Sequence, residues 1–92
     1  MIKLLDNEVL TLQYVPEFGA WTYHLRIPGT KDLAGRWGDL KVSGSIDDFP
    51  IQKLNLAPRK GEDKLLSINS EIRSAIGKSG GDQVTVTLYL HI

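Results

Sequence analysis

Residues 38–46 are Gly-Asp-Leu-Lys-Val-Ser-Gly-Ser-Ile, and residues 81–89 repeat their pattern as Gly-Asp-Gln-Val-Thr-Val-Thr-Leu-Tyr. In both stretches a Gly-Asp turn precedes alternating apolar and polar residues, which is typical of a half-buried strand. A short segment with helical potential precedes each turn, beginning at Pro28 in the first case and after Asn69, a good N-cap, in the second. The sequence therefore predicts an internal repeat of strand, short helix, turn and strand. The two predicted units span approximately residues 21–46 and 64–92.

The rest of the chain also consists mainly of predicted strands. In residues 21–27, Trp21, Tyr23, Leu25 and Ile27 alternate with Thr22, His24 and Arg26, so the first set is expected to face the core. Residues 2–15 are predicted to form another long strand with Leu10, Leu12 and Tyr14 on one face. About six strands and one or two short helices would leave exposed sheet edges unless the sheet closed on itself. The sequence predicts one mainly β domain, residues 1–92, built as a small closed barrel.

Several irregularities are expected within these strands. Asp6-Asn7 interrupts the first strand, and a phase switch near Gln52 or Lys53 indicates a bulge. Gly44 falls on the inner face of its strand, where glycine often marks a close backbone approach. Asp47-Asp48 is interpreted as a tight turn and residues 58–63 as a polar loop.

Composition excludes several classes of function. Eleven Lys and Arg residues balance eleven Asp and Glu residues, whereas a surface dedicated to duplex DNA usually needs a basic excess. The chain has no cysteine, which excludes disulfides, thiolate catalysis and cysteine metal sites. No apolar run approaches the roughly 18 residues of a membrane span, and the first residues lack the pattern of a signal peptide. A cytoplasmic protein with no membrane association is therefore expected.

The second unit resembles a known DNA-binding module. Its residues Ile72-Arg73 through Gly77, followed by Gly81-Asp82-Gln83-Val84, resemble the swapped-hairpin unit of the AbrB/MazE transcription factors. Two such units, from two chains, interlock in those proteins as a double-split barrel that binds DNA. The whole chain resembles the domain of unknown function 1905 family more closely, through the motifs at residues 21–28, 42–46, 49–51 and 72–84. This resemblance implies a single-chain double-split barrel with a pseudo-twofold axis and an unassigned activity.

Residues 35–38, Gly-Arg-Trp-Gly, form the most suggestive segment for binding. Trp37 beside Arg36 could stack against a ring or a base. It could equally close the end of the barrel where the first helix is short. We favour the second interpretation, because burying an aromatic side chain strongly stabilises a thin core.

Two further arginines are candidate binding residues. Arg73 is expected on the outer side of its helix, where it would either contact phosphate or pair with Asp82 or Glu71 and brace the helix. Bracing is the preferred interpretation, since the sequence shows no basic neighbours for Arg73. Arg59 is expected in a solvated loop, where nearby acidic residues largely cancel its field.

The two histidines, His24 and His91, are both interpreted as solvent-exposed strand residues. A hydrolytic metal site usually needs three protein ligands, and the sequence has no His/Asp/Glu triplet at ligand spacing. Neither a metal nor another cofactor is therefore expected.

The leading hypothesis is a non-catalytic binding or accessory module for an unknown small ligand or protein, because no nucleophile and base are recognisable in the sequence. A nucleic-acid-binding domain of the swapped-hairpin type is one alternative. A minimal-site enzyme that uses Asp or Arg near Trp37 is another. The face of Thr85, Thr87 and Tyr89 is also a candidate for assembly, so a monomer or a weak homodimer is expected.

Overall fold

The computed structural model describes residues 1–33 and 40–91. Within these ranges it contains seven strands, one 3₁₀ helix and one α-helix. In chain order these are β1 (Ile2–Thr11), β2 (Gln13–Tyr14), η1 (Pro16–Trp21), β3 (Tyr23–Arg26), β4 (Lys41–Ile46), β5 (Phe49–Arg59), β6 (Glu62–Ser67), α1 (Ser70–Ile76) and β7 (Gln83–Leu90). The prediction of a mainly β fold is confirmed.

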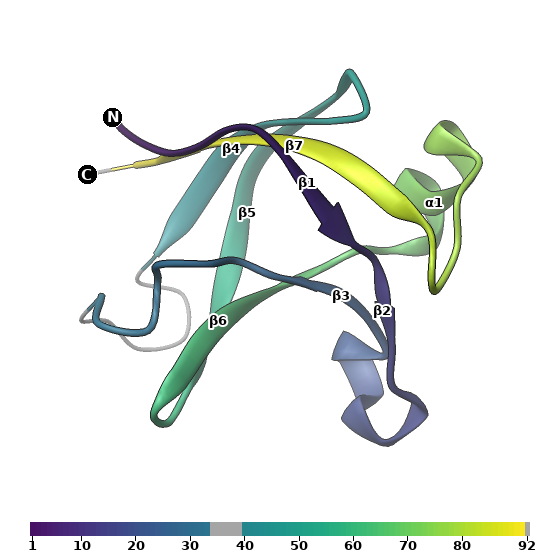
Figure 1. Ribbon diagram of the computed structural model, residues 1–92, viewed down its shortest axis with the longest axis horizontal. Coiled ribbons are helices and arrows are strands. Elements are labelled where there is room, and N and C mark those ends of the chain that lie inside the picture. Colours follow the sequence, from purple (N-terminus) through teal and green to yellow (C-terminus); the bar gives the residue numbers. More distant parts are fainter. Residues whose placement is uncertain (34–39, 92) are drawn as a thin grey trace.

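The strands form a single antiparallel sheet with the order β1-β7-β4-β5-β6-β3-β2. This sheet curves into an open half-barrel, with α1 against β5 and η1 against β3 and β6 (Figure 1). The end strands β1 and β2 are consecutive in the chain and are separated only by Leu12. Closure of the sheet into a double-split barrel stays a prediction.

The described residues form seven strands in place of about six, because the predicted first strand divides at Leu12. The backbone of Leu12 forms hydrogen bonds with the two residues that precede β7. Its N–H donates to Asp82 O at 2.8 Å, and its carbonyl accepts from Gly81 N at 2.8 Å. Its side chain is buried, whereas Tyr14 is 54% exposed. The prediction that Tyr14 would lie on the same face as Leu12 is therefore wrong, because the chain leaves β7 at Leu12 and continues along β3.

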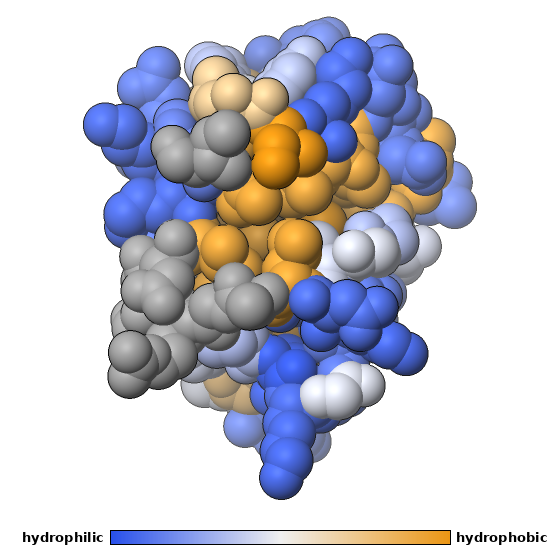
Figure 2. All heavy atoms as spheres, turned by 90° about the vertical axis from the view of Figure 1, so that its left-hand side faces the viewer, coloured by the Kyte–Doolittle hydropathy of each residue, from blue (hydrophilic) through white to orange (hydrophobic). Residues whose placement is uncertain are grey.

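The core consists mainly of the apolar residues that alternate along the strands. Val42 and Ile46 of β4 and Val84, Val86, Leu88 and Leu90 of β7 are all buried, as predicted. Apolar side chains also gather on the surface on the side of the half-barrel where the two termini lie (Figure 2). No helix in the described ranges is long and apolar enough to cross a membrane.

The expected strand irregularities are observed. Register shifts interrupt the β1–β7 ladder on both sides of Leu5, and Asn7 has a φ of 51°. Lys53 has a φ of 51° opposite the shift between Val42 and Gly44, which confirms the bulge in β5. These bulges bend the strands and increase their twist, so they contribute to the curvature of the sheet.

Helix α1 begins and ends as its sequence predicts. The Asn69 side chain accepts a hydrogen bond from Ile72 N at 2.9 Å, and Gly77 ends the helix with a φ of 67°. The predicted helical turns of the first unit are only partly described. Through Leu33 that segment forms turns, with a hydrogen bond from Leu33 N to Thr30 O at 3.1 Å.

Residues 58–63 do not form the polar loop that their composition suggests. Strand β5 continues through Arg59 and β6 begins at Glu62, so only Lys60 and Gly61 form the turn. Gly61 has a φ of 69°, a left-handed conformation that glycine adopts without steric cost. Arg59 is therefore held opposite Glu62 at the end of a hairpin.

Candidate functional site

A small pocket lies where η1 meets the β5–β6 hairpin. Its volume is about 210 Å³, and it is lined by Trp21, Ala57, Pro58, Arg59 and Leu65. Ala57 and Leu65 are almost fully buried and form the floor, while Trp21 and Arg59 are partly exposed. The pocket thus combines apolar walls with one cationic side chain.

Aromatic packing holds the Arg59 side chain at the edge of this pocket. The guanidinium carbon lies 4.7 Å from the centroid of the Phe18 ring, a cation–π distance. Phe18 in turn stacks on His24, with the ring centroids 5.4 Å apart and the planes at 16°. A continuous stack therefore runs from His24 through Phe18 to Arg59. This stack restricts the rotamers that the Arg59 side chain can adopt.

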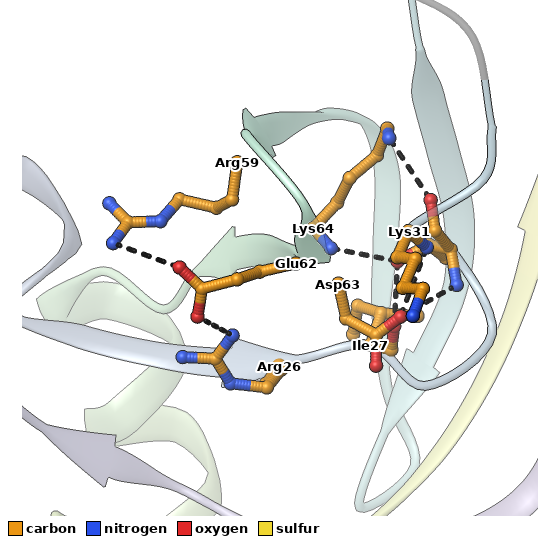
Figure 3. Close-up of polar contacts among 8 residues, drawn as sticks. Arg26, Ile27, Lys31, Arg59, Glu62, Asp63 and Lys64 are labelled. Carbon is orange, nitrogen blue, oxygen red and sulfur yellow. Dashed lines mark hydrogen bonds and ion pairs between the residues drawn. The ribbon is translucent and has the colours of Figure 1, made fainter.

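Arg59 shares one carboxylate with a second arginine, Arg26 of β3. Glu62 lies between the two guanidinium groups in Figure 3. Its Oε1 is 3.2 Å from Arg26 Nη1, whereas its Oε2 is 3.9 Å from Arg59 Nη2. The Arg26 contact is a hydrogen bond and the Arg59 contact is only a long ion pair. This triad carries a net positive charge, and Arg59 is its less neutralised member.

His24 is buried, so the prediction that it would be exposed is wrong. Only 1% of the residue is accessible, because η1 folds over β3 and places Phe18 on the ring. Its Nδ1 lies 2.7 Å from the Trp21 carbonyl, which can only accept a hydrogen bond, so Nδ1 carries the proton. Burial lowers the pKa of His24 below its ordinary value of 6.5. The hydrogen bond to Trp21 acts in the opposite direction, while the positive charges of Arg26 and Arg59 lower the pKa further.

We expect the free energy of unfolding to decrease as the pH falls below about 6.5. The unfolded chain then binds a proton at His24 that the folded protein resists, since the folded pKa is lowered. A His24→Asn variant, whose amide can replace Nδ1, should lose this part of the pH dependence. Urea unfolding between about pH 5 and pH 7 measures the pH dependence of the free energy of unfolding, with His91→Asn as the control. An unchanged slope in His24→Asn would contradict the assignment.

Arg73 braces its helix, but not through the expected carboxylates. Its Nη1 donates to Ile68 O at 2.7 Å, and its guanidinium carbon lies 3.7 Å from the centroid of the Tyr23 ring. Tyr23 also packs against Tyr14, with the centroids 4.9 Å apart. Asp82 accepts from Ser79 N at 2.9 Å, so it stabilises its own turn. The predicted pairing with Asp82 or Glu71 is therefore not observed in the described residues.

Asp47-Asp48 forms a turn, as predicted, and Asp47 is also an ion-pair partner. Lys78 Nζ lies 2.6 Å from Asp47 Oδ2, and Thr85 N donates to Asp47 Oδ1 at 2.8 Å. Desolvation alone would raise the pKa of Asp47, but these hydrogen bonds and the Lys78 charge hold it below its ordinary value. Asp47 therefore ties the β4–β5 turn to the segment after α1.

A contact that no pattern in the sequence indicates joins Ser43 and His91, which are 48 residues apart. Ser43 Oγ and His91 Nε2 are 2.6 Å apart, and Lys53 N donates to the same Oγ at 2.9 Å. His91 is therefore half-buried and hydrogen-bonded, not free in solvent. A serine and a histidine at this distance resemble a nucleophile and its base. In the described residues no carboxylate orients the imidazole, so the contact is better explained as a brace between β4 and the end of β7.

The remaining sequence predictions concern Arg36 and Trp37, which lie outside the described residues. Of the candidate binding residues, Arg59 lies in the pocket and Arg73 lies in the Tyr14–Tyr23 cluster. The described residues contain no group of three or more His, Cys, Asp or Glu side chains that could hold a metal ion.

Comparison with protein families assigns the chain to one family. The model described as Domain of unknown function (DUF1905) matches residues 11–88. The chain belongs to this family. No curated protein and no solved structure matches the chain.

The DUF1905 match contains the whole candidate site. All five residues that line the pocket lie between residues 11 and 88, as do Phe18, His24 and Glu62. His91 lies outside the match, so the Ser43–His91 contact is only partly within it. The pocket is therefore built from the part of the chain that defines the DUF1905 domain.

Proposed function

We propose that this DUF1905 domain is a non-catalytic binding module whose ligand site is the pocket at Trp21 and Arg59. The observation that carries this proposal is the combination of four apolar lining residues with one guanidinium group in a preformed hollow. Small-molecule sites are typically such apolar concavities with a few oriented polar groups. Because Phe18 restricts Arg59 before any ligand arrives, less conformational entropy is lost on binding.

The chemistry of the pocket favours binding over catalysis. Among the described residues that line it, only Arg59 is ionisable, and a guanidinium cannot act as a base at neutral pH. The Nδ1 of His24 donates to a backbone carbonyl and the ring is buried beneath Phe18. The minimal-site enzyme is accordingly the weaker hypothesis for this pocket.

The nucleic-acid alternative has less support. Arg73, the residue that would contact phosphate, is half-buried and already bonds Ile68 and Tyr23. Its neighbour Tyr14 is 54% exposed and could stack on a base, but the net charge of the chain is zero. A module that bound the phosphate backbone would need several free cations along one face.

We expect Arg59→Gln to weaken the binding of anionic ring-containing fragments at this pocket by about tenfold. Lys60→Gln removes the same charge from the adjacent turn, where the side chain does not line the pocket, and should bind as the wild type does. Chemical-shift changes of labelled protein, titrated with a mixture of neutral, cationic and anionic single-ring compounds, check both variants. Equal losses in the two variants, or shifts that avoid Trp21 and Ala57, would contradict the proposal.

A monomer is the proposed state in solution. The long edge strand β1 has two register shifts and exposed Lys3 and Glu8, features that discourage edge-to-edge pairing. The predicted assembly face is also partly covered, because Thr87 Oγ1 accepts from Asn7 N at 3.1 Å and Lys3 lies 5.6 Å from the Tyr89 ring. Light scattering at high concentration tests this proposal.

We also propose that the two predicted units are related by a pseudo-twofold axis, as a single-chain double-split barrel requires. Corresponding strands of the units are antiparallel neighbours: β3 pairs with β6, and β4 pairs with β7. Leu25 lies opposite Leu66, which is its equivalent when Ile27 is aligned with Ile68. This arrangement supports the repeat, and an experimental structure that includes residues 34–39 would test it.

A further inference from the structure

We infer that the ligand of this pocket is a small monocarboxylic acid with a single flat apolar ring. This inference rests on the proposed function and adds the chemical class of the ligand. Three properties of the site carry it: the size of the hollow, the apolar character of its floor, and the incomplete neutralisation of Arg59.

The size of the pocket limits the ligand to about one ring. Pockets for drug-sized molecules are usually 300–1,000 Å³, whereas an apolar cavity of about 150 Å³ holds benzene. The volume of about 210 Å³ at Trp21 lies between these values. It therefore fits a single ring with a short side arm, and it is too small for a nucleotide.

The walls favour a flat apolar body. Ala57 and Leu65 are 5% and 1% exposed and present only aliphatic surface at the floor. The Trp21 indole and the Pro58 ring line the sides. Aromatic and proline rings offer flat apolar contact, so a planar ring would bury more area here than a branched chain.

Arg59 supplies the charge complement for a carboxylate. The nearest described carboxylate, Glu62, is 3.9 Å from Arg59 Nη2, beyond hydrogen-bond distance, because Glu62 bonds Arg26 at 3.2 Å. The hydrogen bonds of the described residues include none from the Arg59 guanidinium. A guanidinium fork matches a carboxylate in a bidentate manner. The arm of the ligand is therefore expected to carry its acid group toward Arg59.

The charge balance also selects a monoanion. Only one guanidinium from the described part of the chain lines the pocket, and the Glu62 carboxylate is close enough to repel a second negative charge. Phosphate monoesters, which carry nearly two charges at neutral pH, usually need several cationic partners. A carboxylate accordingly fits this site better than a phosphate does.

The test compares phenylacetate with phenylacetamide, which has the same ring and arm without the charge. Labelled protein is titrated with each, and the backbone amides of Trp21, Ala57, Arg59 and Leu65 report binding. We expect phenylacetate to bind about tenfold more tightly than the amide. Arg59→Gln should remove this difference, and Arg59→Lys should retain part of it. Both changes are at a partly exposed side chain, and dispersed spectra confirm that the variants fold.

The outcomes separate the ligand class from the proposed function. Equal affinity for phenylacetate and phenylacetamide at these residues would show that the ligand need not be a carboxylic acid. The pocket would still be a binding site. Tighter binding of phenyl phosphate than of phenylacetate would overturn the class in favour of phosphate. No binding of any of the three compounds at about 10 mM would overturn both the class and the pocket, since even a fragment in a suitable site reaches that range.

Discussion

Gly44→Ala should destabilise the protein by about 4 kcal/mol, enough to unfold a marginally stable domain. A Cβ atom built on Gly44 lies 2.0 Å from the Thr87 carbonyl oxygen and 2.9 Å from its carbon. Both atoms belong to the backbone of β7, which is bonded to β4 on one side and β1 on the other. They cannot move away without breaking the centre of the sheet. Gly44 also has a φ of 153°, which other residues rarely adopt.

Gly61→Ala is the matched control for this prediction. Gly61 also has a positive φ, 69°, but a Cβ atom there has nothing within 4 Å. Its loss should be limited to backbone strain of about 1 kcal/mol. Urea unfolding of the two variants measures the difference. Similar small losses at both positions would show that β4 and β7 are not packed as closely as the structure has them.

Thr30→Val should destabilise the protein by about 3 kcal/mol although it changes the side-chain volume little. Thr30 is fully buried after β3, where its hydroxyl donates to Ile27 O at 2.7 Å and accepts from Lys64 N at 2.8 Å. Figure 3 shows Ile27, Asp63 and Lys64 converging on this turn. Valine would leave a buried donor and a buried acceptor without partners. Lys64 Nζ, 3.0 Å from the Thr30 carbonyl, would keep its contact.

Thr11→Val provides the comparison, since Thr11 is an exposed residue of β1. Valine is at least as suitable as threonine in a strand, so this change should alter the free energy of unfolding by less than about 0.5 kcal/mol. Equal effects of the two substitutions in urea unfolding would mean that the Thr30 hydroxyl does not anchor the β3 turn to β6.

The alternation of apolar and polar residues predicted the core correctly in strands that bury one face along their whole length. Residues 84–90 show this, because β7 lies between two other strands and alternates without interruption. The same rule failed at His24, where η1 covers the outer face of β3 and buries a residue expected in solvent. Sequence periodicity reports one buried face, and it cannot detect a second layer formed by a segment such as Pro16–Trp21.

The candidate site was only partly predictable for a related reason. The sequence indicates Arg59 as a possible binding residue. The composition of residues 58–63, however, suggests a loop in which acidic neighbours cancel the charge of Arg59. The two-residue turn at Lys60-Gly61 instead places Arg59 on a strand, and Arg26 competes for Glu62 from β3. Phe18 and Trp21 carried no local signal of binding, because their role depends on contacts with residues about 40 positions away.

The most direct test of the Trp21–Arg59 pocket as the ligand site is a chemical-shift map of one labelled sample at low salt. The sample is titrated first with a short DNA duplex and then with the single-ring mixture. Our account predicts that the duplex leaves the spectrum unchanged and that the rings shift Trp21, Ala57, Arg59 and Leu65. Shifts at Arg73 and Tyr14 with DNA, and none at Trp21 with the rings, would contradict it and favour a nucleic-acid-binding domain.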